Sequence, residues 1–222
     1  MTMTGEIFQP VRLYYEIRNM NMVLKKFAAM SCMNYDKANK RWTWLYDGDS
    51  MSLQFKNSYE SIPENRRPII LGSFYASGNN SMHLDVGSIE RATTAVVFFD
   101  QKLGKSVAEN TFFAIYNKIL PEAELPGANF DKLFAEVKTD EIYAKQEAAV
   151  QRSLAMMKAG RIMEVLHERK FDLVEAFPTN FYSDGIRGLE LSLHMRQIVA
   201  IKRWRGDGNY SLSDVICSSF NI

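Results

Sequence analysis

The amino-acid sequence predicts an α+β fold: a mainly antiparallel sheet with a buried helix (about 89–103), a broken helical segment (about 139–170) and a C-terminal β element. Short loops separate successive segments in which apolar and polar residues alternate, which is typical of antiparallel strands. The segment 89–103 instead places apolar residues at helical spacing, and 139–170 is dominated by strong helix formers. These three patterns together indicate the α+β class.

The chain is expected to begin with a strand and a helix. Val11–Ile17 alternates between an apolar face and a more polar face, which indicates a half-buried strand. Asn19 and Asn21 are candidate N-caps for a short helix that ends near Met30.

Antiparallel strands follow in the next part of the chain. They are expected at 32–36, 41–47, 69–77 and 81–86. In the second of these, Trp42, Trp44 and Tyr46 share one face. Period-2 aromatics of this kind are typical of a strand that buries one side.

The helix at 89–103 has clear signals at both ends. Ser88 is a good N-cap, and Gly104 occupies the position just past the C-terminus that favours glycine. A strand is expected next at 110–119, followed by a proline-containing linker at 120–127 and a short helix capped by Asn129.

The long helical segment begins at Thr139. Its apolar residues before and after Gly160 point in nearly opposite directions, so one straight helix does not fit. We therefore predict two helices, 139–159 and 161–170, that meet at Gly160. If the wide apolar face of the first helix stays uncovered, self-association through it is expected.

The C-terminal part is expected to return to strands. Residues 171–177 favour a short strand, and alternating apolar residues from Leu189 to Ile201 predict a long one. A final short helix should follow Ser211, which with Asp214 resembles a capping box. We expect residues 1–120 to form an α+β core, with 121–222 packed on it in one globular unit.

Composition places the protein in a broad class. The 222 residues carry a net charge of +1, so no overall field favours nucleic acid or membranes. The two cysteines form no C-x-x-C pair, which favours free thiols in a reducing compartment. The N-terminus does not resemble a signal peptide, and no apolar run reaches the ~20 residues of a membrane span. A cytoplasmic protein with no membrane partner is expected.

Catalytic motifs are missing from the sequence. It contains no nucleotide-binding glycine motif, nucleophile elbow or zinc-binding spacing, so we expect no cofactor and no metal and favour a non-catalytic protein. His83 and Asp85 lie two apart on the outward face of a strand and could act as a base and its orienting acid, or as half of a metal site. Solvated surface residues are the favoured interpretation of this pair.

Basic and aromatic residues form the most suggestive pattern. Cations that follow phosphates and aromatics that stack on bases are used by single-stranded nucleic-acid sites. The alternative is that the aromatics of the hairpin are core residues. The candidate residues are Lys40, Arg41, Trp42, Trp44, Arg66, Arg67, Lys202, Arg203, Trp204 and Arg205.

Two functional hypotheses follow from these patterns. The first is a non-catalytic cytosolic binding or assembly protein that acts through contacts with a protein partner or with itself. The second is a protein that binds RNA or single-stranded nucleic acid through the basic and aromatic residues.

Overall fold

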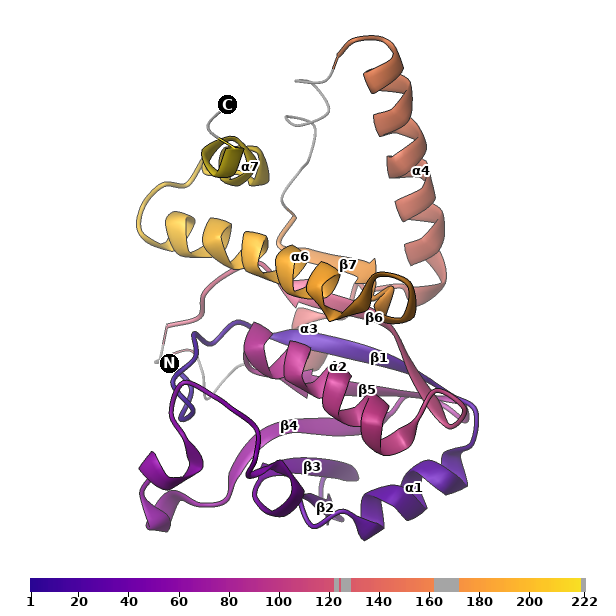
Figure 1. Cartoon of the computed structure of the whole chain (residues 1–222), viewed down its shortest axis with the longest axis vertical. Helices are drawn as coiled ribbons and strands as arrows, with labels where there is room; N and C mark the ends of the chain where they lie inside the picture. The colour runs from indigo at the N-terminus through magenta and orange to yellow at the C-terminus, as the bar shows by residue number, and fades with distance from the viewer. Residues whose placement is uncertain (122–123, 125–128, 162–171, 221–222) are drawn as a thin grey trace.

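A seven-stranded antiparallel sheet is the centre of the molecule. The computed structural model describes all residues except 122–123, 125–128, 162–171 and 221–222. Within the described residues the strand order is β2-β3-β4-β5-β1-β6-β7 (Figure 1). The strands are β1 (Val11–Ile17), β2 (Met33–Asp36), β3 (Arg41–Tyr46), β4 (Ile69–Ala76), β5 (Ser81–Val86), β6 (Ala108–Tyr116) and β7 (Val174–Pro178).

Most of the helix contacts with the sheet are on one face, and one short helix lies on the other. The described helices are α1 (Met20–Ala29), α2 (Ile89–Leu103), α3 (Phe130–Leu133), α4 (Thr139–Lys158), α6 (Phe181–Trp204) and α7 (Leu212–Phe220). Helix α2 contacts the central strands, and α1 and α6 flank it (Figure 1). Helix α3 lies on the opposite face, α7 packs on α6, and α4 projects from the body.

The core lies between the sheet and α2. The alternation in β1 buries Val11, Leu13, Tyr15 and Ile17 on the face toward the helices. Aromatic rings of Phe27, Phe74 and Phe99 meet there with centroids 4.8–6.0 Å apart. The α+β class and the mainly antiparallel sheet are therefore confirmed.

Helix α2 begins and ends where its capping residues predict. The Ser88 side chain accepts a hydrogen bond from the Arg91 backbone N–H, and Gly104 ends the helix with φ +79°. Asn19 and Asn129 likewise cap α1 and α3 with their side chains. The expected strand at 110–119 is observed as β6, which begins and ends slightly earlier.

The predicted long strand from Leu189 to Ile201 is wrong, because these residues form the second part of α6. The buried residues follow a helical spacing: Leu189, Leu193, Arg196, Gln197, Val199 and Ala200. Leu191, which completed the period-2 pattern, is 64% exposed. Leucine, methionine and glutamine are also better helix formers than strand formers, so helix propensity opposes the alternating pattern in this segment.

The predicted break at Gly160 is consistent with the end of α4 at Lys158, since Gly160 has φ +75°. The second predicted helix, 161–170, lies almost entirely outside the described residues. The C-terminal β element is β7, which pairs with β6. Arg196 of α6 then binds Glu175 of β7 at 3.0 Å, so the C-terminal part joins the same sheet.

Two further expectations concern the cysteines and membrane-spanning helices. Both cysteines are free, with Cys32 buried and Cys217 half-buried. Among the described residues, no helix combines the length and apolar character that crossing a membrane requires.

Candidate functional site

Polar side chains form two rows on the sheet face opposite α2. The pairing of β4, β5 and β1 aligns Tyr75, His83 and Tyr14 in one row. It aligns Ser73, Asp85 and Arg12 in the next row. Because neighbouring strands place paired residues on the same face, the outward positions of β5 become the centre of a polar cluster.

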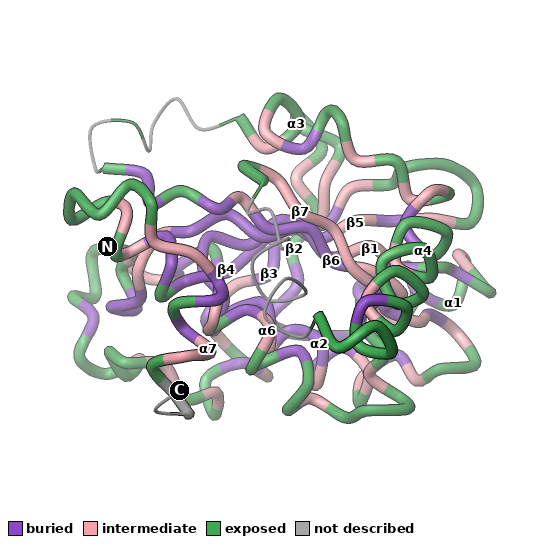
Figure 2. The backbone as a smooth tube through the Cα atoms, turned by 90° about the horizontal axis from the view of Figure 1, so that it is seen from above, coloured by how far each residue is buried: buried purple, intermediate pink, exposed green. Residues whose placement is uncertain are grey.

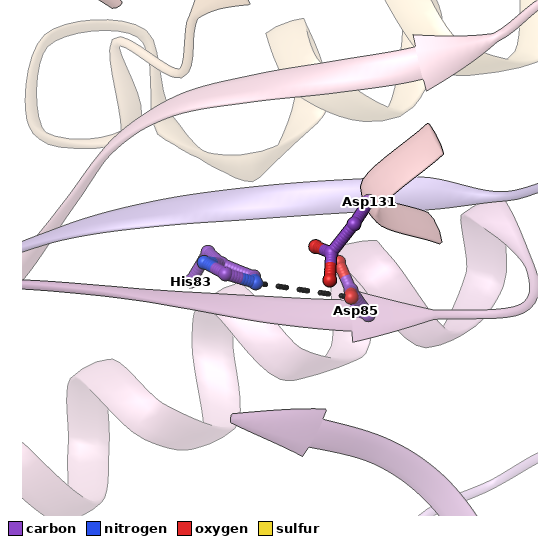
Figure 3. Close-up of side chains that lie close together, drawn as sticks. All are labelled: His83, Asp85 and Asp131. Atoms are coloured by element: carbon purple, nitrogen blue, oxygen red, sulfur yellow. Dashed lines mark ion pairs between the residues drawn. The ribbon is translucent and has the colours of Figure 1, made fainter. Parts of the chain in front are cut away.

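The Arg12–Asp85 pair holds this cluster together. Arg12 donates to both carboxylate oxygens of Asp85, at 2.6 and 2.9 Å, and both side chains are 8% exposed. The Arg12 Nη2 also donates to Asp131 of α3 at 2.8 Å. Its guanidinium lies over the Phe134 ring, 5.3 Å from the centroid. These contacts dock α3 on the sheet, and Figure 3 shows Asp131 of α3 close to His83 and Asp85 of β5.

The environment shifts the pKa of both members of the pair. Burial raises the pKa of the Asp85 carboxyl to about 6, and the hydrogen bonds and charge of Arg12 offset only part of this effect. Burial lowers the pKa of Arg12, but its hydrogen bond and charge interaction with Asp85 raise it by more, so the net shift is upward. Both groups are therefore charged at neutral pH.

His83 is enclosed beside this pair. Its Nδ1 lies 2.6 Å from the Ser77 hydroxyl, and its ring stacks on Tyr75 with centroids 5.3 Å apart. Its buried Nε2 has no hydrogen-bond partner in the described residues and lies 3.9 Å from an Asp85 oxygen. Burial, and then the charge of Arg12, lower the pKa of His83 to about 4. The imidazole is therefore neutral at physiological pH.

Ligand atoms of His83, Asp85 and Asp131 lie within 4.8 Å of one another, as a metal site would require. The residue types suit a divalent cation. However, the Arg12 Nη2 already donates to both carboxylates, so a cation would have to displace a buried guanidinium. An Arg–carboxylate network that fixes α3 explains the arrangement with no added group.

The sequence identified two members of this cluster and missed two. His83 and Asp85 are mostly buried rather than solvated surface residues, which corrects the favoured interpretation. Arg12 lies on the more polar face of the β1 pattern, and its one signal is that, like Asp85, it is a charge on the outward face of a strand. Asp131 carries no such signal, because only the tertiary fold brings α3 to β5.

The hairpin β2–β3 places some of the predicted nucleic-acid residues beside a hollow of about 340 Å³. Tyr35, Lys40 and Trp42 line it, together with apolar side chains of α1. The Tyr35 and Trp42 rings lie 5.2 Å apart, and Tyr35 is 44% exposed. In this hollow, part of the basic and aromatic pattern offers an accessible ring surface.

Other predicted residues near the hairpin have structural partners. Arg41 points to the opposite face and bonds Asp36 at 3.1 Å. Trp44 is completely buried and donates to Ser50, so it belongs to the core. Arg67 donates to backbone oxygens and covers the Tyr59 ring, whereas Arg66 is exposed.

The basic run at the end of α6 lies at the other side of the sheet. Helix α6 packs near β6 and β7, whereas β2 and β3 form the opposite edge (Figure 1). Lys202 covers the Tyr210 ring, Arg203 donates to the Tyr210 carbonyl, and Trp204 is 62% exposed. Arg205 follows as the C-cap residue. The two basic clusters therefore do not meet on one surface.

Helix α4 carries the longest exposed apolar stripe on a single helix among the described residues. Tyr143, Val150, Leu154 and Met157 are 57%, 48%, 45% and 51% exposed. At 100° per residue these four side chains fall within an arc of about 60°. Only Ile142 and Met156 of this helix are buried. In Figure 2 most of the α4 backbone has the colour of exposed residues.

The comparisons with known proteins add no relative. No protein-family model, curated protein or solved structure matches this chain.

Proposed function

We propose that this protein is a non-catalytic binding or assembly protein whose partner is a protein that docks on α4. The stripe of Tyr143, Val150, Leu154 and Met157 carries the proposal. Exposed apolar residues scattered singly are normal, but a helix-length row of them marks an interaction site. Helix-on-helix recognition uses this spacing of anchors.

The position of α4 supports this role. Its contacts with the body lie toward its N-terminal end, where the helix meets β7 and Tyr143 touches Phe112 with ring centroids 4.9 Å apart. The rest of the helix projects from the body (Figure 1). Covering each half-exposed side chain of the stripe would stabilise a complex by about 1 kcal/mol. The free cysteines are consistent with the reducing cytoplasm, where we place the protein.

The test is site-specific photo-crosslinking in cells that make the protein. A photoreactive amino acid replaces Val150 in the stripe or, as the control, Ala148, which is exposed on the far side of α4. We expect a discrete protein adduct from position 150 and none from position 148. Equal labelling from both positions, or none from either, would contradict the proposal.

A stability measurement shows whether the stripe is free for binding. Changing Val150 and Leu154 to Ser should alter the free energy of unfolding of the monomer by no more than about 0.5 kcal/mol, because both are surface positions. A loss of several kcal/mol in dilute solution would show that the stripe serves the protein's own fold.

The hollow at β2–β3 favours a second candidate function, the binding of single-stranded nucleic acid. Tyr35 and Trp42 provide ring faces for a base, and Lys40 at the rim provides a charge for phosphate. Helix α1 and β4 close the apolar floor with Leu24 and Phe74.

Tryptophan fluorescence tests this candidate. With Trp204 changed to Phe, a short single-stranded oligonucleotide should quench Trp42 at low salt, and Lys40→Glu should weaken the effect. Arg205→Glu, at the other side of the sheet, is the matched control. Failure of any oligonucleotide to quench at low salt would exclude the hollow as a base-binding site.

A further inference from the structure

We infer that the partner docked on α4 is α4 of a second copy of this chain, antiparallel to the first, with Val150 on the two-fold axis. This inference rests on the proposed function and names the partner. It makes the dimer isologous, so that the same patch of each copy forms both sides of the contact.

The stripe has the symmetry that such a contact needs. Tyr143 lies seven residues before Val150 and Met157 lies seven after it, and all three point in nearly the same direction. In an antiparallel pair centred on Val150, each Tyr143 therefore faces Met157 of the other copy. Leu154 lies on the same arc and faces the partly buried Gln146.

The charges of α4 favour the antiparallel direction. Its first turn holds Asp140 and Glu141, and its last turn holds Lys158. Asp140 and Lys158 lie on the same flank of the stripe, both about 60° from Tyr143. Antiparallel pairing places Asp140 of one copy beside Lys158 of the other at both ends of the contact. Parallel pairing would instead bring the two acidic first turns to one end of the contact and the two Lys158 residues to the other, with no opposite charges paired.

The shape of the molecule favours the same direction. Since α4 meets the body toward its N-terminal end, an antiparallel pair separates the two bodies by roughly the 30 Å length of the helix (Figure 1). A parallel pair would bring both bodies to the same end of the contact, where they would crowd each other.

The size of the contact predicts a weak dimer. From Tyr143 to Met157 the stripe is about 21 Å long, which is shorter than the contacts of typical stable dimers. We therefore expect a dissociation constant at or above about 1 µM. Sedimentation at a few hundred micromolar should show the dimer, and dilution below 1 µM should show the monomer.

Cysteine pairing distinguishes the direction of the helices. In a Cys217→Ser background, with Cys32 fully buried, one preparation carries Tyr143→Cys and another carries Met157→Cys. We expect mild oxidation of the mixture to give a disulfide dimer between the two variants, with little from either alone. Disulfides from each variant alone, at the same yield as in the mixture, would overturn the antiparallel arrangement.

Charge reversal provides an independent readout. Asp140→Lys and Lys158→Asp should each weaken dimerisation about tenfold, because two symmetry-related pairs change sign, and the double variant should restore it. Arg152→Glu, on the far side of α4, is the matched control and should change nothing. Weakening by Arg152→Glu equal to that by Asp140→Lys would contradict the proposed geometry.

The photo-crosslinking experiment separates this inference from the proposed function. An adduct from position 150 with the mass of two chains supports both. An adduct of another mass, with no dimer at a few hundred micromolar, overturns the homodimer but leaves α4 as a docking helix. No adduct specific to position 150 overturns both.

Discussion

Replacing Arg12 with Met should destabilise the protein by about 3 kcal/mol at pH 7.5. The guanidinium donates to both Asp85 oxygens, and only 8% of either side chain is exposed. Without Arg12, Asp85 remains in a buried site with no cation beside it. Removing one partner of a buried ion pair typically has a cost of this size. Asp131 is 80% exposed and can return to water, so its loss of Arg12 adds little.

The pH dependence of this loss is the sharper part of the prediction. Because burial raises the pKa of Asp85 to about 6, above the 3.8 of an exposed aspartate, the folded protein binds this proton more tightly than the unfolded protein. The contribution of Asp85 to stability is therefore fully present below about pH 4 and is lost as the pH rises through about 6. At pH 5 the carboxyl is largely protonated, and the cost of Arg12→Met should fall to about 1 kcal/mol.

Urea unfolding followed by circular dichroism measures both values. Arg12→Met/Asp85→Leu provides the control, since replacing both partners with apolar residues of similar size should recover most of the lost stability. A loss below 1 kcal/mol at pH 7.5 would refute the reasoning, as would an equal loss at pH 5.

Three further predictions concern other parts of the fold. His83 has a pKa lowered to about 4, so its contribution to stability is present above pH 6.5 and lost as the pH falls toward 4. As the pH falls from 6.5 to 4, the free energy of unfolding of His83→Asn should therefore rise by about 3 kcal/mol relative to that of the unmodified protein. Chemical denaturation at several pH values measures this, and the same pH dependence in both proteins would contradict it. Leu193→Ala should lower the free energy of unfolding by about 2–5 kcal/mol, whereas Leu191→Ala should change it by no more than about 0.5 kcal/mol. Thermal or urea unfolding measures both, and equal losses would argue against the helical assignment of this part of α6. A Cβ on Gly72 would lie 2.8 Å from the backbone of β5, so Gly72→Ala should destabilise the protein by about 1–3 kcal/mol. Gly208 faces open space, so Gly208→Ala should leave the stability unchanged. A neutral Gly72→Ala would show that β4 can shift.

The C-terminal part shows where pattern reasoning reached its limit. Leu189, Leu191 and Leu193 alternate like a strand, yet only the first and third are buried. An exposed leucine on a helix, such as Leu191, produces the same sequence pattern as an inward-facing position of a strand. Arg196 and Gln197 are buried polar residues, which no apolar pattern identifies.

The candidate sites show a similar division. Periodicity placed His83 and Asp85 on one strand face, but their partners Arg12 and Asp131 come from β1 and α3. The basic and aromatic residues lie in three runs of sequence, and the topology places the last run, at the end of α6, away from the sheet edge formed by β2 and β3.

The sequence by itself determined the α+β class, the sheet strands of the first half, the capped helix α2 and the end of α4 near Gly160. These features depend on local periodicity, capping and glycine conformation, which neighbouring residues contain. Only the tertiary structure decided that residues 189–201 belong to a helix, that Arg12 joins Asp85 to Asp131, and that the stripe on α4 faces solvent. Those outcomes depend on which elements cover one another, and such coverage is set by contacts between residues far apart in the chain.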